Sequence, residues 1–526
     1  MSVKNLSIVI VAHQPFFRHV TGENEIPGQE NDLLFGAISQ TYIPLIDMLH
    51  RFEEEGIKSK FSIVLSPSLC AMLSDEVLQK QYVQWLDRCI LFGQKEVERL
   101  KKEPELCKNA GIILEKAIHN KTVFVENYNC NLVKEFASFA KKGFIEILAT
   151  TGTYAFLPHY SDMPEILNAQ IETGIISHKH FFETAPEGFW LPYMGFAKGI
   201  ERNLRSYGIN YTLIDSHGLL FSESCPDTGI FAPVRCFNSL VLFARDRETP
   251  FDINDEENGY SANKVYKNQN KDAGFELTSQ ELEGFIEADS VRTNTLYRYW
   301  SKESDSNAAY DAEKAEAQAV KDGIDFLNRK NEKLNKAAEQ IGGDVTLTCT
   351  ISAHTLGQTW AEGMIFLETV LRNNKESNFI SHGQLIKDQF KLPKVVPYPS
   401  ASSGTGYGED LLDSSNCWML RYTRKMCERM VDLAGRFPDD TGLKVRLLNI
   451  GAKELMLAQS GELAKMIHEN MLPDFVQQYF NSSVTDFTAV FDALGSNVVS
   501  TEWLTKLEKK HNLFPWMNYR IFSQKM

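Results

Sequence analysis

The chain has 526 residues, 43% of them hydrophobic, which is enough for a large core and suggests two or three packed units. Its formal net charge of −14 argues against a nucleic acid or an anionic membrane surface as a partner, whereas a neutral sugar polymer is compatible with it. The nine cysteines form no CxxC pair, and this favours reduced thiols in a cytoplasmic protein over disulfides or a zinc site. No apolar run reaches the ~18 residues of a membrane span.

Strand patterns and helix patterns alternate along the first 370 residues. Short runs of β-branched and other apolar residues predict buried strands at 6–12, 61–65, 146–150 and 210–215. Amphipathic spacing predicts helices at 32–52, 76–100 and 199–207. This alternation is typical of an α/β fold with parallel strand pairing.

The later part of the chain changes character. The polar segment 251–272 predicts a loop or insertion, and the segment 308–338, rich in Ala, Lys and Glu, predicts one or two helices. A strand at 344–351 and a helix at 357–372 follow. The stretch 391–407 contains three prolines and a Ser/Gly-rich end, and we expect it to link to a last domain with helical patterning.

The stretch Gly188 to Ile200 reads Gly-Phe-Trp-Leu-Pro-Tyr-Met-Gly-Phe-Ala-Lys-Gly-Ile, and it looks like the end of a barrel strand. Catalytic side chains usually lie at that end of a β/α barrel. The stretch resembles the Trp-x-Pro-Glu-Cys-Ala-Tyr motif of glycoside hydrolase family 57. In that family the Glu is the catalytic nucleophile, and the matching residue here is Tyr193.

The resemblance to this family extends along nearly the whole chain. The segments 11–19, 215–221 and 457–462 resemble, in the same order, segments of the branching-enzyme subgroup. The resemblance implies a distorted seven-stranded (β/α) barrel at 1–390 with a small inserted domain around 215–275, and an α-helical C-terminal domain at 391–526. It implies an α-glucan such as glycogen or a maltooligosaccharide as the bound molecule, and no cofactor or metal.

Three positions where the family carries catalytic groups differ in this chain. A retaining glycosidase needs two carboxyl groups about 5–5.5 Å apart. Besides Tyr193 at the nucleophile position, Ser352 stands where the family has its acid/base Asp, and Tyr154 replaces a His. We expect His13, Tyr154, Tyr193, Asp215 and Ser352 to converge at the carboxyl ends of the strands.

Other residues match positions beside the substrate in the family. The resemblance assigns substrate binding to His13, Arg18, Tyr193, Asp215, His217, Arg245, Trp360, Trp418 and Glu462. Several of these have a structural alternative: Trp360 as a core residue, and Glu462 as a surface carboxylate. Asp215 and His217 could instead take over acid/base chemistry, and Tyr193 could act as a nucleophile.

Two hypotheses follow. The first is a catalytically silent relative of 1,4-α-glucan branching enzymes that keeps a glucan-binding cleft. The second is an active branching enzyme or 4-α-glucanotransferase that uses relocated groups. A scaffold that no longer binds sugar is a third alternative, and the sequence identifies no protein partner.

Overall fold

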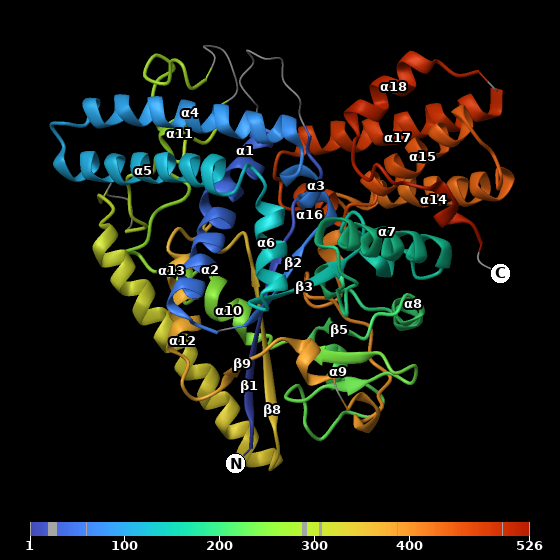
Figure 1. The fold of residues 1–526 in the computed structure, drawn as a ribbon, viewed down its shortest axis with the longest axis horizontal. Coiled ribbons are helices and arrows are strands. Elements are labelled where there is room, and N and C mark those ends of the chain that lie inside the picture. Colours follow the sequence, from blue (N-terminus) through green and yellow to red (C-terminus); the bar gives the residue numbers. More distant parts are fainter. Residues whose placement is uncertain are drawn as a thin grey trace.

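The computed structural model describes residues 2–18, 29–58, 60–286, 292–303, 308–386, 388–496 and 498–524. Its centre is one curled β-sheet (Figure 1). The strands are β1 (Lys4–Ala12), β2 (Phe61–Leu65), β3 (Ile145–Thr150), β4 (Gly188–Trp190), β5 (Tyr211–Ile214), β6 (Val234–Arg235), β7 (Val241–Ala244), β8 (Val345–Ser352) and β9 (Asn378–Phe379).

The strand order is β6-β7-β5-β4-β3-β2-β1-β8, with β9 paired to the start of β1. All of these pairs are parallel except β6 with β7. A further parallel bridge joins Arg245, after β7, to Thr348 in β8. Seven parallel strands therefore close on themselves, which confirms the predicted seven-stranded barrel. The barrel is uneven because β4 has three residues whereas β1 has nine.

Helices cover the outside of the barrel and extend beyond it. They are α1 (Gln29–Ala37), α2 (Ile43–Glu55), α3 (Pro67–Leu73), α4 (Glu76–Arg99), α5 (Pro104–Thr122), α6 (Leu132–Lys141), α7 (Pro164–Phe182), α8 (Ile200–Ser206), α9 (Ser216–Leu220), α10 (Glu248–Asn254), α11 (Ala273–Glu276), α12 (Ala312–Ile341) and α13 (Gly363–Asn373). The long helices α4 and α5 lie side by side as a hairpin that projects from the barrel (Figure 1).

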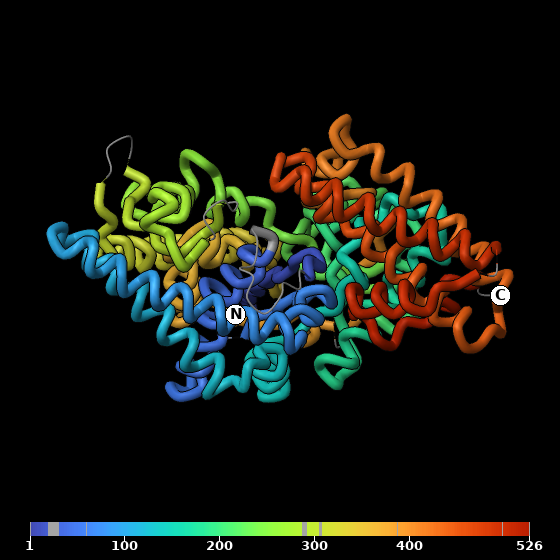
Figure 2. Tube along the Cα trace, turned by 90° about the horizontal axis from the view of Figure 1, so that it is seen from above, coloured from blue at the N-terminus to red at the C-terminus, as the bar shows by residue number. Residues whose placement is uncertain are grey.

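A second group of helices lies beside the barrel, at the right of Figures 1 and 2. It contains α14 (Cys417–Arg436), α15 (Leu443–Ala458), α16 (Gly461–His468), α17 (Pro473–Ser496) and α18 (Thr501–Lys510). Eleven of the 16 residues of α15 are buried, so this helix forms the centre of the group. The short α16 faces the barrel, where the backbone N–H of Gly461 donates to the carbonyl of Tyr154 at 3.3 Å.

Several predicted elements differ from the structure in ways that have local causes. The helix expected at 32–52 is divided, because a π-helical turn η1 (Ile38–Tyr42) separates α1 from α2. The helix expected from residue 357 begins at Gly363, since residues 353–362 form turns around Gly357, whose φ of +126° an L side chain rarely adopts. The region expected to hold an insertion, 215–275, contains the barrel strand β7.

Candidate functional site

A cavity of about 400 Å³ opens at the carboxyl ends of the barrel strands. Its lining includes His13 after β1, Tyr154 after β3, Tyr193 after β4, Arg245 after β7 and Ser352 at the end of β8. The parallel pairing of β1 with β8 places Val11 beside Ser352 and explains why these strand ends meet. This is the end of a β/α barrel at which active sites are found.

The C-terminal helices close the other side of the cavity. Glu462 and Lys465 on α16, and Glu469 just after it, line the cavity opposite the strand ends. Their spacing of three and four residues places them on one face of the helix. Lys465 binds Glu469 with an N–O distance of 3.3 Å, so two of the three charges neutralise each other.

Tyr193 and Glu462 join the two parts of the protein at the cavity. The Tyr193 hydroxyl donates a 2.5 Å hydrogen bond to Oε2 of Glu462. Desolvation in the cavity raises the pKa of the Glu462 carboxyl. Desolvation and the neighbouring Glu462 raise the pKa of Tyr193 well above its ordinary value, so the phenol keeps its proton near neutral pH.

The backbone around Tyr193 is strained. Tyr154, Tyr193 and Met194 have φ values of +56°, +53° and +51°, in the left-handed region that favours glycine. Each such residue costs about 1–3 kcal/mol, which the surrounding structure must offset. Strain of this kind is concentrated at functional sites in proteins, and here two of the three side chains line the cavity.

His13, Tyr154 and Trp190 form one ordered aromatic wall. The His13 ring stacks on Tyr154 with ring centres 3.8 Å apart, and Trp190 Nε1 donates to the Tyr154 hydroxyl at 3.0 Å. His13 Nδ1 lies 2.9 Å from Ser66 Oγ. Desolvation lowers the pKa of His13 to about 3, so its ring is neutral. Its Nε2 is buried without a hydrogen-bond partner in the structure, and a ligand hydroxyl would supply one.

Asp215 and His217 lie behind the cavity wall and do not line it. Buried Asp215 accepts from Arg245 Nε at 2.7 Å, and its other oxygen lies 2.8 Å from His217 Nδ1. The other ring nitrogen of His217 lies 2.8 Å from the carbonyl oxygen of Gly406. Asp215 therefore positions Arg245, which lines the cavity, and His217 positions Asp215.

Three residues with an expected role in substrate binding lie elsewhere. Arg18 binds Asp75 with an N–O distance of 2.8 Å, outside the cavity lining. Trp360 is fully buried in the core. Trp418 packs on Phe480 in the C-terminal helices, with ring centres 5.2 Å apart. The His19 of the 11–19 motif lies outside the described residues.

The sequence reasoning did not single out Trp190, Lys465 or Glu469, all of which line the cavity. Trp190 belongs to the stretch Gly188 to Ile200, which resembles the nucleophile motif of the family. The other two follow Glu462 at helical spacing, a pattern that could have indicated their shared face. Among the described residues, no cluster of three or more side chains suits a metal ion, and no helix is long and apolar enough to span a membrane.

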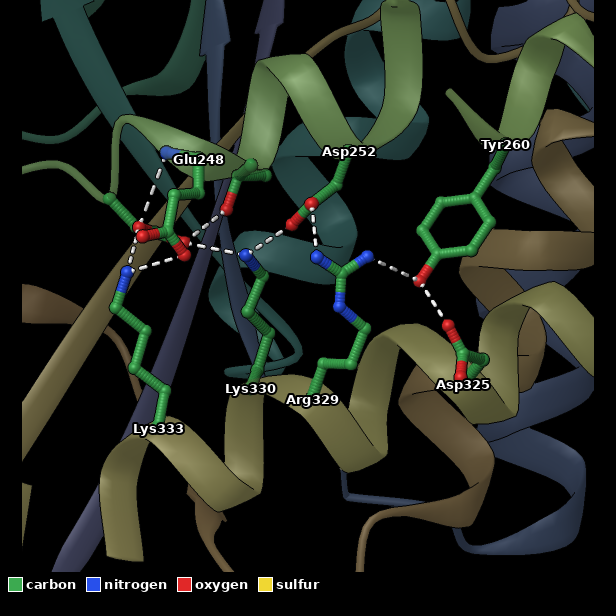
Figure 3. Close-up of polar contacts among 9 residues, drawn as sticks. Glu248, Asp252, Tyr260, Asp325, Arg329, Lys330 and Lys333 are labelled. Carbon is green, nitrogen blue, oxygen red and sulfur yellow. Dashed lines mark hydrogen bonds and ion pairs between the residues drawn. The ribbon is translucent and has the colours of Figure 1, made fainter. Parts of the chain in front are cut away.

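A buried charge network fixes the helix that forms another part of the cavity wall (Figure 3). Helix α10 contributes Pro250 and Asn254 to the lining. Lys330 of α12 donates to Asp246 at 2.7 Å and to Asp252 at 2.6 Å, and its side chain is 2% exposed. Because Asp246 follows Arg245 directly, the network holds both Arg245 and α10 in place.

Comparison with known proteins agrees with this geometry. Residues 7–368 match the family model for glycosyl hydrolase family 57, and residues 422–522 match that for the 1,4-alpha-glucan branching enzyme C-terminal region. A relative, the 1,4-alpha-glucan branching enzyme TK1436 of Thermococcus kodakarensis, is 21% identical over 97% of this chain and 77% of its own length.

Solved structures show the same fold. The alpha-amylase AmyC of Thermotoga maritima has a TM-score of 0.91 at 28% identity and covers 100% of both chains. The structure of TK1436 in complex with glucose and additives has a TM-score of 0.86 at 19% identity, covering 100% of this chain and 97% of that one. Since the first family model covers more than half of the sequence, the chain belongs to glycosyl hydrolase family 57.

Proposed function

We propose that this protein binds a short stretch of α-glucan in the barrel cavity and does not turn it over. Membership of the family and the match to the branching-enzyme C-terminal region support an α-glucan as the bound molecule. The cavity offers groups suited to a neutral sugar chain: aromatic side chains in its lining, among them Tyr154 and Trp190, and an unpartnered nitrogen at His13.

The absence of turnover rests on one observation, the chemical groups at the strand ends. The end of β8 carries the hydroxyl of Ser352, and the turn after β4 carries the phenol of Tyr193. Among the described lining residues, the carboxylates are Glu462 and Glu469. Neither carboxylate lies at a strand end: Glu462 is on α16, and Glu469 directly follows that helix. The strand ends that line the cavity therefore lack the pair of carboxyl groups that a retaining mechanism uses.

A second function has an observation in its favour. The hydrogen bond from Tyr193 to Glu462 pairs a phenol with a carboxylate, and some glycosidases use a tyrosine nucleophile. In an active enzyme Glu462 would accept the phenol proton while Tyr193 attacks the anomeric carbon. The raised pKa of Tyr193 opposes this reaction, and Ser352 offers no acid for the leaving group.

Binding can be tested by calorimetry with maltoheptaose. Ser352 is exposed to the cavity, so Ser352→Trp should fill it and weaken binding at least tenfold without unfolding the protein. Ser206→Trp, on the exposed end of α8, is the matched control and should bind as the unaltered protein does. Equal binding by both variants would place any sugar site outside this cavity.

A further inference from the structure

A second cavity, of about 310 Å³, lies between α2, α4, α5, α13 and the segment 295–298. It is separate from the glucan cavity, but the two share a wall. The π-helical turn η1 contributes Gln40 to the second cavity and Tyr42 to the first. Likewise, the turn after β8 contributes Gly357 to the second cavity and Gln358 to the first.

The charged side chains that line this second cavity are mainly cationic. Four of them are Arg or Lys, and two are carboxylates. Both carboxylates already have polar partners: Asp47 Oδ2 lies 2.7 Å from His119 Nε2, and Glu368 binds both Arg51 and Arg372. Of the remaining cations, Arg298 pairs with Asp272, whereas Glu362 lies near Lys267 without an ion pair to it.

Lys116 and Lys267 are the two lysines of this lining. Among the described residues, neither ammonium group has an ion-pair partner, and Lys267 Nζ lies 4.5 Å from the centre of the Tyr310 ring. Desolvation, together with the nearby Lys116, lowers the pKa of Lys267 to about 7. A bound anion would reverse this shift, because an opposite charge favours the protonated amine.

Two buried donors of this cavity also lack a well-formed hydrogen bond. Trp85 Nε1 makes none, and Arg298 Nε has only an ion-pair contact with Asp272 at 3.2 Å. Apolar side chains complete the wall, among them Met364 and Ile365 of α13. The cavity thus combines unsatisfied donors and positive charge with an apolar surface, and buried donors usually have partners in native proteins.

We propose that this second cavity binds a small organic oxyanion, a carboxylate or a phosphate ester carried on an apolar group. The ammonium groups of Lys116 and Lys267 receive the oxyanion, and Trp85, Met364 and Ile365 contact the apolar part. The proposal is independent of glucan binding, because it uses none of the residues that line the first cavity.

The test is calorimetry on the full-length protein with phenyl phosphate and benzoate as probes and neutral phenol as the uncharged comparison. We expect saturable binding of at least one anion, much weaker binding of phenol, and no competition by maltoheptaose. Stronger binding of phenyl phosphate indicates a phosphate ester, and stronger binding of benzoate a carboxylate.

Variants locate the site. Lys267→Met and Lys116→Met should each weaken anion binding at least tenfold, whereas Lys506→Met, an exposed lysine on α18, should change nothing. Met keeps the length of the apolar stem, and melting temperatures of all variants should stay close to that of the unaltered protein. No anion binding by the unaltered protein, or undiminished binding by both Lys116→Met and Lys267→Met, would overturn the proposal.

Discussion

Replacing Lys330 by Met should destabilise the protein through the buried network between α10 and α12. The Lys330 ammonium lies 2.7 Å from Asp246 and 2.6 Å from Asp252, and all three side chains are 10% exposed or less. Removing one partner of a buried ion pair typically costs about 3–5 kcal/mol, because the other charge loses its compensation. We expect the lower end, about 3 kcal/mol, since Lys333 still binds Asp246 and Arg329 still binds Asp252.

Thermal unfolding followed by circular dichroism measures this effect, with Lys336→Met on the same helix as the control. Lys336 pairs with Glu332, but both side chains are more than 60% exposed, so water screens this pair and it contributes little to stability. We expect a clear fall in Tm for Lys330→Met and almost none for Lys336→Met. Equal Tm values would refute the structural role assigned to the network.

Three further predictions concern the cavity and its surroundings. Desolvation raises the pKa of Glu462 in the folded state, so the protein loses stability as the pH rises above about 4.3, the pKa of a free Glu. Glu462→Gln should remove this loss. The Tm of the variant should therefore increase relative to that of the unaltered protein between pH 4 and pH 7. Gly357→Ala should lower Tm strongly, because a Cβ there would lie 2.0 Å from the carbonyl of Gln40 and the φ is left-handed. Trp418→Ala should leave maltoheptaose binding unchanged in calorimetry and reduce stability by about 3–5 kcal/mol at most, since its ring packs on Phe480.

The sequence predicted the barrel well because its strands are short apolar runs with clear ends. The predicted strand 61–65 matches β2 at both ends, and the predicted helix 76–100 differs from α4 by one residue. Helix α4 begins where Asp75 accepts hydrogen bonds from the N–H groups of Val77 and Leu78, a cap that the sequence pattern contains.

The candidate site was only partly predictable, because its residues come from distant parts of the chain. The strand-end motifs predicted that five residues converge, and the structure brings His13, Tyr154, Tyr193 and Ser352 to one cavity. The fifth, Asp215, does not line this cavity. Tryptophans are ambiguous in sequence, since the same ring serves a core or a sugar site; Trp360 lies in the core.

The approach of α16 to the barrel depends on close packing that no local pattern encodes. A Cβ on Gly461 would lie 2.9 Å from the Tyr193 ring, so this glycine lets the helix come near enough for Glu462 to reach the phenol. The contact joins residues 269 positions apart in the chain.

The most direct test of a glucan-binding protein without turnover is incubation of the purified, unaltered protein with amylose. Iodine staining and chain-length analysis follow the polymer, and calorimetry with maltoheptaose on the same sample confirms that the cavity is functional. The account predicts measurable binding with no change in the iodine colour or the chain-length distribution. Cleavage or transfer by the unaltered protein that is lost in Tyr193→Phe would contradict it and would assign catalysis to the Tyr193–Glu462 pair.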